Sequence, residues 1–365
     1  MNALTAPLRR HRAARARQQG FSLIEILIGL LIAMIGVVIM MEVLITSEAR
    51  TRTTTSGTDA MSSGAVMLHM LQADLKQAGY GINSLGLLGC SVTLPIGAAV
   101  PLAPVVVNPP TALVPAGDAN TDTLLVLYGN DNGQPEGNAV ASTAGSDYTV
   151  QAPTAFNVND YVVASTSAAT GPCTGTLTLA QVTAVTALTI TVNTVQAGAT
   201  AVYNLGQSPK VVAYAVRNGS LTSCDFMASD CRVNNATNWT AVAGNIIGLR
   251  AQYGRDTNAG AMNGQVDTWD QTTPTSSCGW ARTPAVRVGL LARSTQYETT
   301  IDPTTKQRVG EVVTANTPTW SGSTGTSTAP FVVNGDAYWQ SYRYRVFEST
   351  APARNIVWMG GQSGC

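Results

Sequence analysis

The stretch that decides the fold is Gly20-Phe21-Ser22-Leu23-Ile24-Glu25, followed by the apolar run ILIGLLIAMIGVVIMM from Ile26 to Met41. Five arginines lie before it, and the next charged residue after Glu25 is Glu42. Counted from Phe21, the run is long enough to cross a hydrocarbon core of about 30 Å as a helix rising about 1.5 Å per residue. Because the arginines lie on one side only, the pattern predicts a cytoplasmic leader and an exported remainder.

Glu25 is unexpected inside an apolar helix, since a carboxylate there costs about 2.5–3.5 kcal/mol on insertion scales. An ordinary secretory signal has its small-residue cleavage site after the apolar region. Here the Gly20–Phe21 bond lies before that region. Cleavage at this bond would remove the charged leader, keep the helix and leave a new amine at Phe21, one helical turn from Glu25.

This arrangement resembles the class III signal of type IV prepilins. The resemblance implies cleavage between Gly20 and Phe21 by a prepilin peptidase and N-methylation of Phe21. It also implies that Glu25 pairs with the terminal amine of a neighbouring subunit during filament assembly. A plain single-span anchor is the alternative, and a mature N-terminal peptide that still contains Arg17 would support it.

Composition narrows the class of protein. The chain has 365 residues and a formal net charge of +0. No basic patch beyond the leader indicates direct binding of nucleic acid. The exported part is rich in Thr, Ala, Val, Gly, Ser and Asn, a composition that is typical of an extracellular β-rich domain. This part is also long enough to bury a substantial core.

The cysteines indicate whether the exported part contains disulfides or a metal site. All six cysteines lie in the exported part, where disulfides are expected: Cys90, Cys173, Cys224, Cys231, Cys278 and Cys365. Sequence alone does not choose among their pairings, but the short spacing of Cys224 and Cys231 favours a local disulfide. A zinc site is disfavoured, because the cysteines lack C-x-x-C spacing and no histidine lies nearby.

The two histidines are His11 in the leader and His69 in the helical stem, so the head has none. This excludes Ser-His-Asp, Cys-His and His-ligated metal chemistry from the head. We therefore expect no enzymatic activity, cofactor or metal. A membrane-anchored periplasmic enzyme or binding module is left without a motif to support it.

Apolar periodicity predicts one long helix. After the membrane-spanning part, a stripe recurs at spacings of three and four up to Gly79-Tyr80-Gly81, a natural helix stop: Met61, Ala65, Leu68, Leu71, Leu75 and Ala78. We expect an α+β fold of the lollipop layout found in pilins. It comprises a leader at 1–20, a helix at 21–80 with its transmembrane half at about 21–47, and a large β-rich, disulfide-containing head at 81–365.

In the head, alternating or continuous apolar runs predict strands: Thr123–Tyr128, Ile246–Tyr253, Ala285–Arg293, Tyr342–Glu348 and Asn355–Trp358. Alternation places Val286, Val288 and Leu290 on one face of the predicted strand Ala285–Arg293. Residues 90–204 are a candidate insertion between the helix and the main sheet.

Three stretches narrow the family: residues 247–257, 286–294 and 342–350. With the signal, they resemble the C-terminal half of the PilW family of type IV pilus minor pilins. The resemblance implies a non-catalytic subunit in the inner membrane, with its head in the periplasm, that later enters the pilus at or near its tip. It would help to prime assembly and so support twitching motility, adhesion or DNA uptake.

The partners implied are other minor pilins, the major pilin, the prepilin peptidase and the inner membrane, with a tip adhesin as a further candidate. A minor pseudopilin of a type II secretion system is the alternative, because it shares the same N-terminus. The arginines of the three stretches either lie on a solvated, carboxylate-paired sheet face or form a subunit contact. The Asp256–Asp267 loop has oxygen ligands suited to calcium, but Gly260 occupies a ligand position and no Glu closes the loop, which favours a calcium-free turn.

Overall fold

A computed structural model describes residues 22–82, 84–130, 137–166, 175–357 and 365. Gly20, Phe21 and Cys173 lie outside these ranges. The chain divides into two compact units, Met1–Arg52 and Thr53–Cys365, and the first helix contributes residues to both.

This helix, α1, spans Leu23–Gln77 and has 55 residues. In the first unit, Leu23–Ile45 is the one described segment that is long and apolar enough to cross a membrane, and none of it is buried. Its 23 residues cover roughly 35 Å as a helix, which matches the thickness of a hydrocarbon core.

In the second unit, α1 packs on the head through a ridge of buried residues: Ala60, Gly64, Met67, Leu71, Leu75 and Ala78. The predicted stripe is correct from Leu68, which is partly buried against the main core, onward. It is wrong before that residue, since Met61 is 49% exposed and Ala65 is exposed. The physical reason is Gly64, which leaves room for the ring of Phe347. A search for apolar side chains passes over a glycine that belongs to the core.

Gly64→Ala should destabilise the head, because an added Cβ would lie 2.3 Å from Cε2 of Phe347. Overpacking of this kind costs about 1–3 kcal/mol. Gly57→Ala is the matched control in the same helix: nothing lies within 4 Å of its Cβ position, and alanine should stabilise the helix by roughly 1 kcal/mol. Thermal unfolding of the detergent-solubilised chain measures both. Shifts of the same sign and size would contradict this packing.

A partly buried polar contact also holds α1 on the head. The Asp74 carboxylate accepts hydrogen bonds from the hydroxyl of Tyr128, at 2.8 Å, and from that of Tyr214. Burial, and then the charge of Asp74, raise the pKa of both tyrosines. Both hydroxyls therefore remain protonated donors at physiological pH.

An antiparallel five-stranded sheet has the order β13-β12-β11-β4-β3. Its strands are β3 Val105–Val107, β4 Thr123–Tyr128, β11 Lys210–Arg217, β12 Ser220–Asp225 and β13 Thr240–Gly244. Strand β4 has the predicted bounds, and all of its residues are buried. An uninterrupted apolar run is what a central, fully buried strand requires.

A four-stranded antiparallel sheet has the order β15-β14-β16-β19. Its strands are β14 Ile246–Arg255, β15 Thr268–Asp270, β16 Ala285–Arg293 and β19 Tyr344–Pro352. The predicted alternation is confirmed, since Val286, Val288 and Leu290 enter the main core. On the other face, Leu291 packs in a separate cluster with Trp320 and Phe331, so that face is covered rather than solvated.

The remaining large sheet has eight strands in the order β2-β1-β8-β7-β10-β5-β6-β9. They are β1 Ser91–Thr93, β2 Ala99–Pro101, β5 Asn138–Ala144, β6 Asp147–Val150, β7 Tyr161–Ser165, β8 Thr176–Val185, β9 Thr189–Val192 and β10 Ala201–Gly206. Residues 90–204 thus build most of this sheet, but β3 and β4 lie in the same range and pair within the five-stranded sheet. The candidate insertion is therefore interleaved with the main core.

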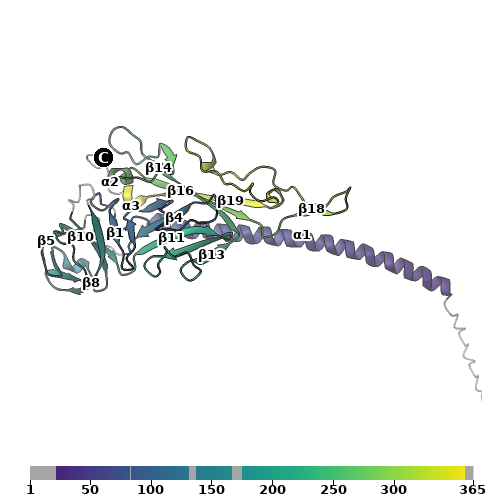
Figure 1. Ribbon diagram of the computed structural model, residues 1–365, viewed down its shortest axis with the longest axis horizontal. Coiled ribbons are helices and arrows are strands. Elements are labelled where there is room, and N and C mark those ends of the chain that lie inside the picture. The colour runs from purple at the N-terminus through teal and green to yellow at the C-terminus, as the bar shows by residue number, and fades with distance from the viewer. Residues whose placement is uncertain (1–21, 83, 131–136, 167–174, 358–364) are drawn as a thin grey trace, which may run out of the picture. The chain divides into compact units, whose positions relative to one another are not determined.

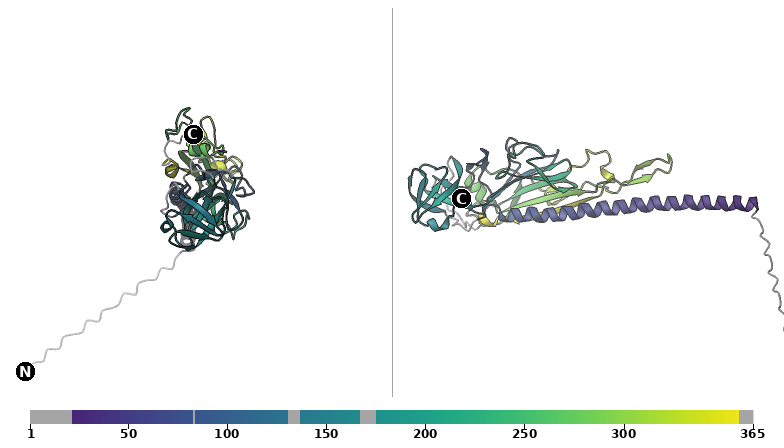
Figure 2. Two further views of the ribbon diagram at one scale, coloured as in Figure 1. Left: turned by 90° about the vertical axis from the view of Figure 1, so that its left-hand side faces the viewer. Right: turned by 90° about the horizontal axis from the view of Figure 1, so that it is seen from below.

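Short elements complete the head. They are η1 Pro153–Ala155, α2 Ser277–Ala281, the hairpin of β17 Thr299–Ile301 and β18 Arg308–Gly310, η2 Ser321–Ser323, η3 Trp339–Ser341 and α3 Arg354–Val357. Strands β5, β8 and β10 lie at one end of the head and the β17–β18 hairpin at the other, as Figures 1 and 2 show.

The strand predicted at Asn355–Trp358 is wrong, because Arg354–Val357 is the short helix α3. The chain turns after β19, where the N–H of Ile356 donates to the carbonyl of Ala353. The Asn355 amide then donates to two carbonyl oxygens at the end of α1, those of Gln77 and Ala78, at 3.0 Å each. Helix ends leave such acceptors open, so α3 serves as a cap on α1.

The predicted fold class is confirmed. A long helix with an apolar first part precedes a large β-rich head that contains disulfides. One main core joins the second part of α1 to the five- and four-stranded sheets and to part of the eight-stranded sheet. A second cluster packs against the rest of the eight-stranded sheet.

Candidate functional site

Glu25 lies in the first turn of α1, where the N–H groups at a helix start favour negative charge. Its side chain is exposed, as are those of Ile24, at 65%, and Ile26, at 58%. The carboxylate thus lies on an apolar surface open to a partner. The predicted cleavage and methylation fall on Gly20 and Phe21, outside the described residues, and stay predictions.

Helix α1 carries a second, outward-facing apolar ridge in its second part. We call the exposed residues Val66, Met70 and Ala73 the outer ridge; Val66 is 58% exposed and Met70 is 52% exposed. Their spacing of four and three places them on one side of the helix, away from the buried ridge. This geometry is suited to packing against another helix.

Four arginines of the three C-terminal stretches are engaged within the head. Arg250 pairs with Asp122 at 3.0 Å, and the Arg287 guanidinium lies 4.5 Å from the ring centroid of Trp269. Arg293 and Arg343 also pair with carboxylates, those of Asp336 and Glu298 respectively. These contacts favour the interpretation that the arginines support the head over the one that they form a subunit contact.

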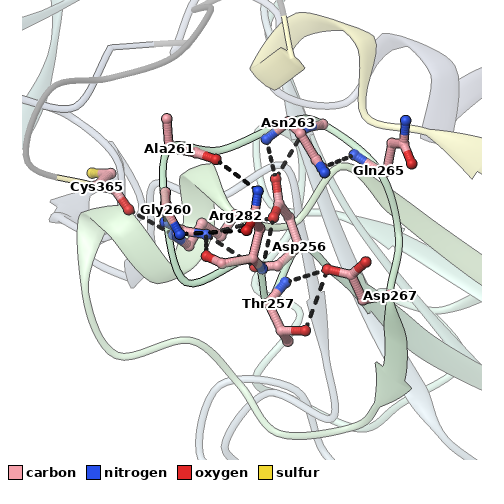
Figure 3. A network of polar contacts seen from close by, with 11 residues as sticks. Asp256, Thr257, Gly260, Ala261, Asn263, Gln265, Asp267, Arg282 and Cys365 are labelled. Atoms are coloured by element: carbon pink, nitrogen blue, oxygen red, sulfur yellow. Dashed lines mark hydrogen bonds and ion pairs between the residues drawn. The ribbon is translucent and has the colours of Figure 1, made fainter.

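The Asp256–Asp267 loop is organised by one buried carboxylate (Figure 3). Asp256 is 2% exposed. Its Oδ1 accepts the N–H of Asn258 at 3.2 Å, and its Oδ2 accepts those of Asn263 at 2.7 Å and Gly264 at 2.9 Å. Both oxygens are therefore committed to folding the loop.

Burial by itself raises the pKa of Asp256, but the N–H donors of Gly264, Asn263 and Asn258, together with Arg282, outweigh it and hold the pKa below its usual range. A carboxyl with a lowered folded-state pKa stabilises the fold above the unfolded pKa of about 4. That stabilisation is lost as the pH falls through the folded-state pKa.

Asp256→Asn should therefore destabilise the head near neutral pH by about 2 kcal/mol, because an amide cannot accept all of these N–H groups. The difference from wild type should shrink as the pH falls through the lowered folded-state pKa of Asp256, where wild type loses the same charge. Asp302→Asn is the control, since Asp302 also accepts backbone N–H groups but is only partly buried and precedes an exposed turn. Thermal unfolding across pH measures this, and a pH-independent difference would contradict it.

The head contains one short-range and one long-range disulfide among its described residues. Cys224–Cys231, with Cα atoms 5.7 Å apart, is the pairing that the sequence favours. Cys278–Cys365, with Cα atoms 5.2 Å apart, connects residues 87 positions apart. Cys90 is disulfide-bonded as well, and Cys173 lies outside the described residues.

No group of three or more His, Cys, Asp or Glu side chains is placed to hold a metal ion in the part of the chain that the structure describes. Around Asp256 the positive charge comes from Arg282 instead, whose Nη1 lies 3.5 Å from Oδ1.

Two family models match the chain, one in its N-terminal part and one in its C-terminal part. Residues 15–41 match the prokaryotic N-terminal methylation motif, a range that includes the leader's end, Glu25 and the start of α1. Residues 213–355 match the type IV pilus-assembly protein W family. The C-terminal part of the chain is therefore similar to this family. This range runs from within β11 to α3, so it includes the sheet that carries the three quoted stretches, and the resemblance to PilW-family pilus proteins is confirmed.

Together with the match to the type IV pilus-assembly protein W family, the methylation motif and the apolar helix indicate a membrane-anchored pilus component. A solved type IV-like pilin from Thermus thermophilus matches 81% of this chain and 96% of its own, at 10% identity and a TM-score of 0.33. A likeness this distant determines neither the function nor the partners. No curated protein matches the chain.

Sequence reasoning missed two features of the site. The outer ridge was detectable, because a helix with apolar residues on two sides shows two stripes at helical spacing. Arg282 was not, because its partners come from segments that are far apart along the chain.

Proposed function

We propose that the chain is a non-catalytic minor pilin that helps to prime assembly of the type IV pilus and lies at or near its tip. The observation that carries this proposal is the order of its parts. A methylation motif leads into an exposed apolar helix, and the helix leads into a head whose C-terminal part matches the PilW family. In this role the protein supports twitching motility, adhesion or DNA uptake.

Processing comes first in this account. A prepilin peptidase removes residues 1–20 and leaves Phe21 as a methylated N-terminus. Leu23–Ile45 holds the chain in the inner membrane with the head in the periplasm until assembly. Glu25 then pairs with the terminal amine of a neighbouring subunit, which offsets the cost of a carboxylate in an apolar environment.

Partners follow from the exposed parts of α1. Other minor pilins and the major pilin pack against its apolar surface, and a tip adhesin is a further candidate partner of the head. The outer ridge supports this role, because it gives α1 a second exposed apolar surface, separate from the membrane-spanning segment. The core contacts of α1 leave this surface unused.

Val66→Glu tests the outer ridge. The charge should lower the share of the protein found in sheared pili by at least about tenfold, equivalent to about 1.4 kcal/mol. Head stability should be unchanged, because Val66 is exposed. Lys76→Glu, at another exposed position of α1, is the control and should enter pili normally. Equal incorporation of both variants would contradict helix packing through this ridge.

A minor pseudopilin of a type II secretion system remains the alternative, because the methylation motif fits both. The PilW match favours the pilus.

A further inference from the structure

The hairpin of β17 and β18 carries apolar side chains on one exposed face. The register pairs Ile301 with Arg308, and the N–H of Glu311 donates to the carbonyl of Glu298 at 2.8 Å, which extends the pairing towards the base of the hairpin. Side chains at every second position of a strand share a face. Three apolar side chains therefore lie on the same face of the hairpin: Tyr297, Ile301 and Val312.

Tyr338 adds a fourth side chain to this face. Its ring stacks on that of Tyr297, with the centroids 5.0 Å apart, and its Cδ1 lies 3.3 Å from the position that a Cβ of Gly310 would take. We call Tyr297, Ile301, Val312 and Tyr338 the hairpin face. These four residues are between 42% and 64% exposed. Exposed apolar residues are ordinary when they are scattered, but a group on one face indicates a site of interaction.

Charge is divided between the two faces of the hairpin. The opposite face carries two acidic residues, a threonine and a valine: Glu298, Glu311, Thr300 and Val309. Arg308 lies beside Ile301 on the hairpin face, and Lys306 lies at the tip; both cations are exposed. The Asp302 carboxylate at the tip accepts two backbone N–H groups within the turn. The hairpin is therefore amphipathic, with its cations next to the apolar side.

Contacts with α1 show which end of the head the hairpin occupies. Gly64 of α1 lies against the ring of Phe347, and the Gln72 amide donates to the hydroxyl of Ser349 at 2.6 Å. Strand β19 therefore runs in the same direction as α1, and its first residue, Tyr344, lies at the end where α1 leaves the head. The hairpin extends from that same end (Figure 1).

The lengths of these segments suit contact with a bilayer. The part of α1 between Ile45, where the apolar segment ends, and Gly64 covers roughly 28 Å as a helix. Strands advance about 3.3 Å per residue, so the start of β19 and one arm of the hairpin together span roughly 30 Å from Phe347, the residue that contacts Gly64. The hairpin is thus as long as the stretch of helix that separates the head from the apolar segment.

We propose that the hairpin face rests on the surface of the bilayer that α1 spans, until the chain enters a pilus. This contact rests on the proposed anchoring of the chain by Leu23–Ile45. Tyrosine is enriched at membrane–water interfaces, where the ring lies at the level of the lipid headgroups. Ile301 and Val312 add apolar area, and Lys306 and Arg308 attract the phosphates of anionic lipids. The contact orients the head on its helix before assembly.

The test uses the full chain in lipid nanodiscs of phosphatidylcholine and phosphatidylglycerol that hold one copy each, so that a second copy cannot supply the contact. All cysteines in the described ranges are disulfide-bonded, so Thr304→Cys at the hairpin tip can be labelled with a dye. Leu188→Cys is the matched control, because Leu188 is exposed between β8 and β9, at the other end of the head. Lipids with a nitroxide on the headgroup quench a dye that touches the bilayer surface.

We expect the nitroxide lipids to quench the dye at Thr304→Cys and not at Leu188→Cys. Adding Ile301→Glu and Val312→Glu together should lower the equilibrium constant for contact by at least about tenfold, because the burial of two aliphatic side chains is lost. Thr300→Glu with Val309→Glu adds the same charge to the opposite face and should leave the contact in place. All four positions are exposed, and thermal unfolding verifies that the head stays folded.

Equal quenching at the two labelled positions, or an equal loss of contact in the two double variants, would overturn the proposal. Contact that appears only in nanodiscs holding two copies would also overturn it, since the hairpin face would then bind a second copy of the chain. Recovery of the chain with the nanodisc tests the anchoring by Leu23–Ile45 separately. No readout depends on pilus assembly, so failure of this contact and failure of the proposed function are distinguishable.

Discussion

Glu25→Ala should leave the chain inserted and cleaved, yet reduce pili at least about tenfold when it is the sole copy, equivalent to about 1.4 kcal/mol. Insertion should improve, because the change removes a charge that costs about 2.5–3.5 kcal/mol in the apolar core. Assembly should fail, because in a low-dielectric environment the unpaired amine of a neighbour has no nearby counter-charge. Glu25 is exposed in the first turn of α1, where a neighbour can reach it.

Glu42→Ala is the matched control. Glu42 lies on the same helix near the end of the apolar segment Leu23–Ile45. The substitution therefore removes a carboxylate without changing the helix start. The measurements are pilin in sheared fractions and the mass of the mature N-terminal peptide. Normal piliation with Glu25→Ala, or equal defects in both variants, would argue against charge pairing.

Removing the Cys278–Cys365 disulfide should destabilise the head more than removing Cys224–Cys231. The two disulfides close loops of different length, with sequence separations of 87 for Cys278–Cys365 and 7 for Cys224–Cys231. If a disulfide stabilises the fold by lowering the entropy of the unfolded chain, the longer loop contributes about 4.6 kcal/mol and the shorter about 2.5 kcal/mol. The long link also holds the main-chain oxygen of Cys365 against Arg282. Its loss should therefore loosen the Asp256–Asp267 loop as well.

Urea unfolding of paired Cys→Ser variants measures this, with Cys224→Ser/Cys231→Ser as the control for the loss of any disulfide. The midpoint should fall further for Cys278→Ser/Cys365→Ser. An equal or larger fall for the Cys224→Ser/Cys231→Ser variant would contradict this prediction. The disulfide that spans 87 positions would then not be the one that most restricts the conformations of the unfolded chain.

Local patterns predicted local structure well. The apolar helix, the buried strand Thr123–Tyr128 and the alternation in Ala285–Arg293 each depend on neighbours in sequence. The structure has the helix from Leu23 onward and both strands. Periodicity failed at Gly64, since the contact that buries it comes from Phe347 on β19. It also failed at Asn355, whose role is to cap a helix that ends at Gln77.

The pairing of segments that are far apart along the chain could not be predicted from the sequence. The eight-stranded sheet joins β1 to β8 in parallel and β10 to β5, and such pairings leave no mark on either strand alone. The same holds for Arg282, whose oxygen partners lie at residues 256–260 and at Cys365. A single sequence shows the charge of Arg282 but not what surrounds it.

The most direct test of the central claim is a strain that lacks this gene, measured for surface pilin in sheared fractions and for secreted exoprotein in its medium. A minor pilin of the type IV pilus predicts lost pili with normal secretion, restored by the wild-type gene. Normal pili with blocked secretion would contradict it and make the protein a minor pseudopilin of a type II secretion system.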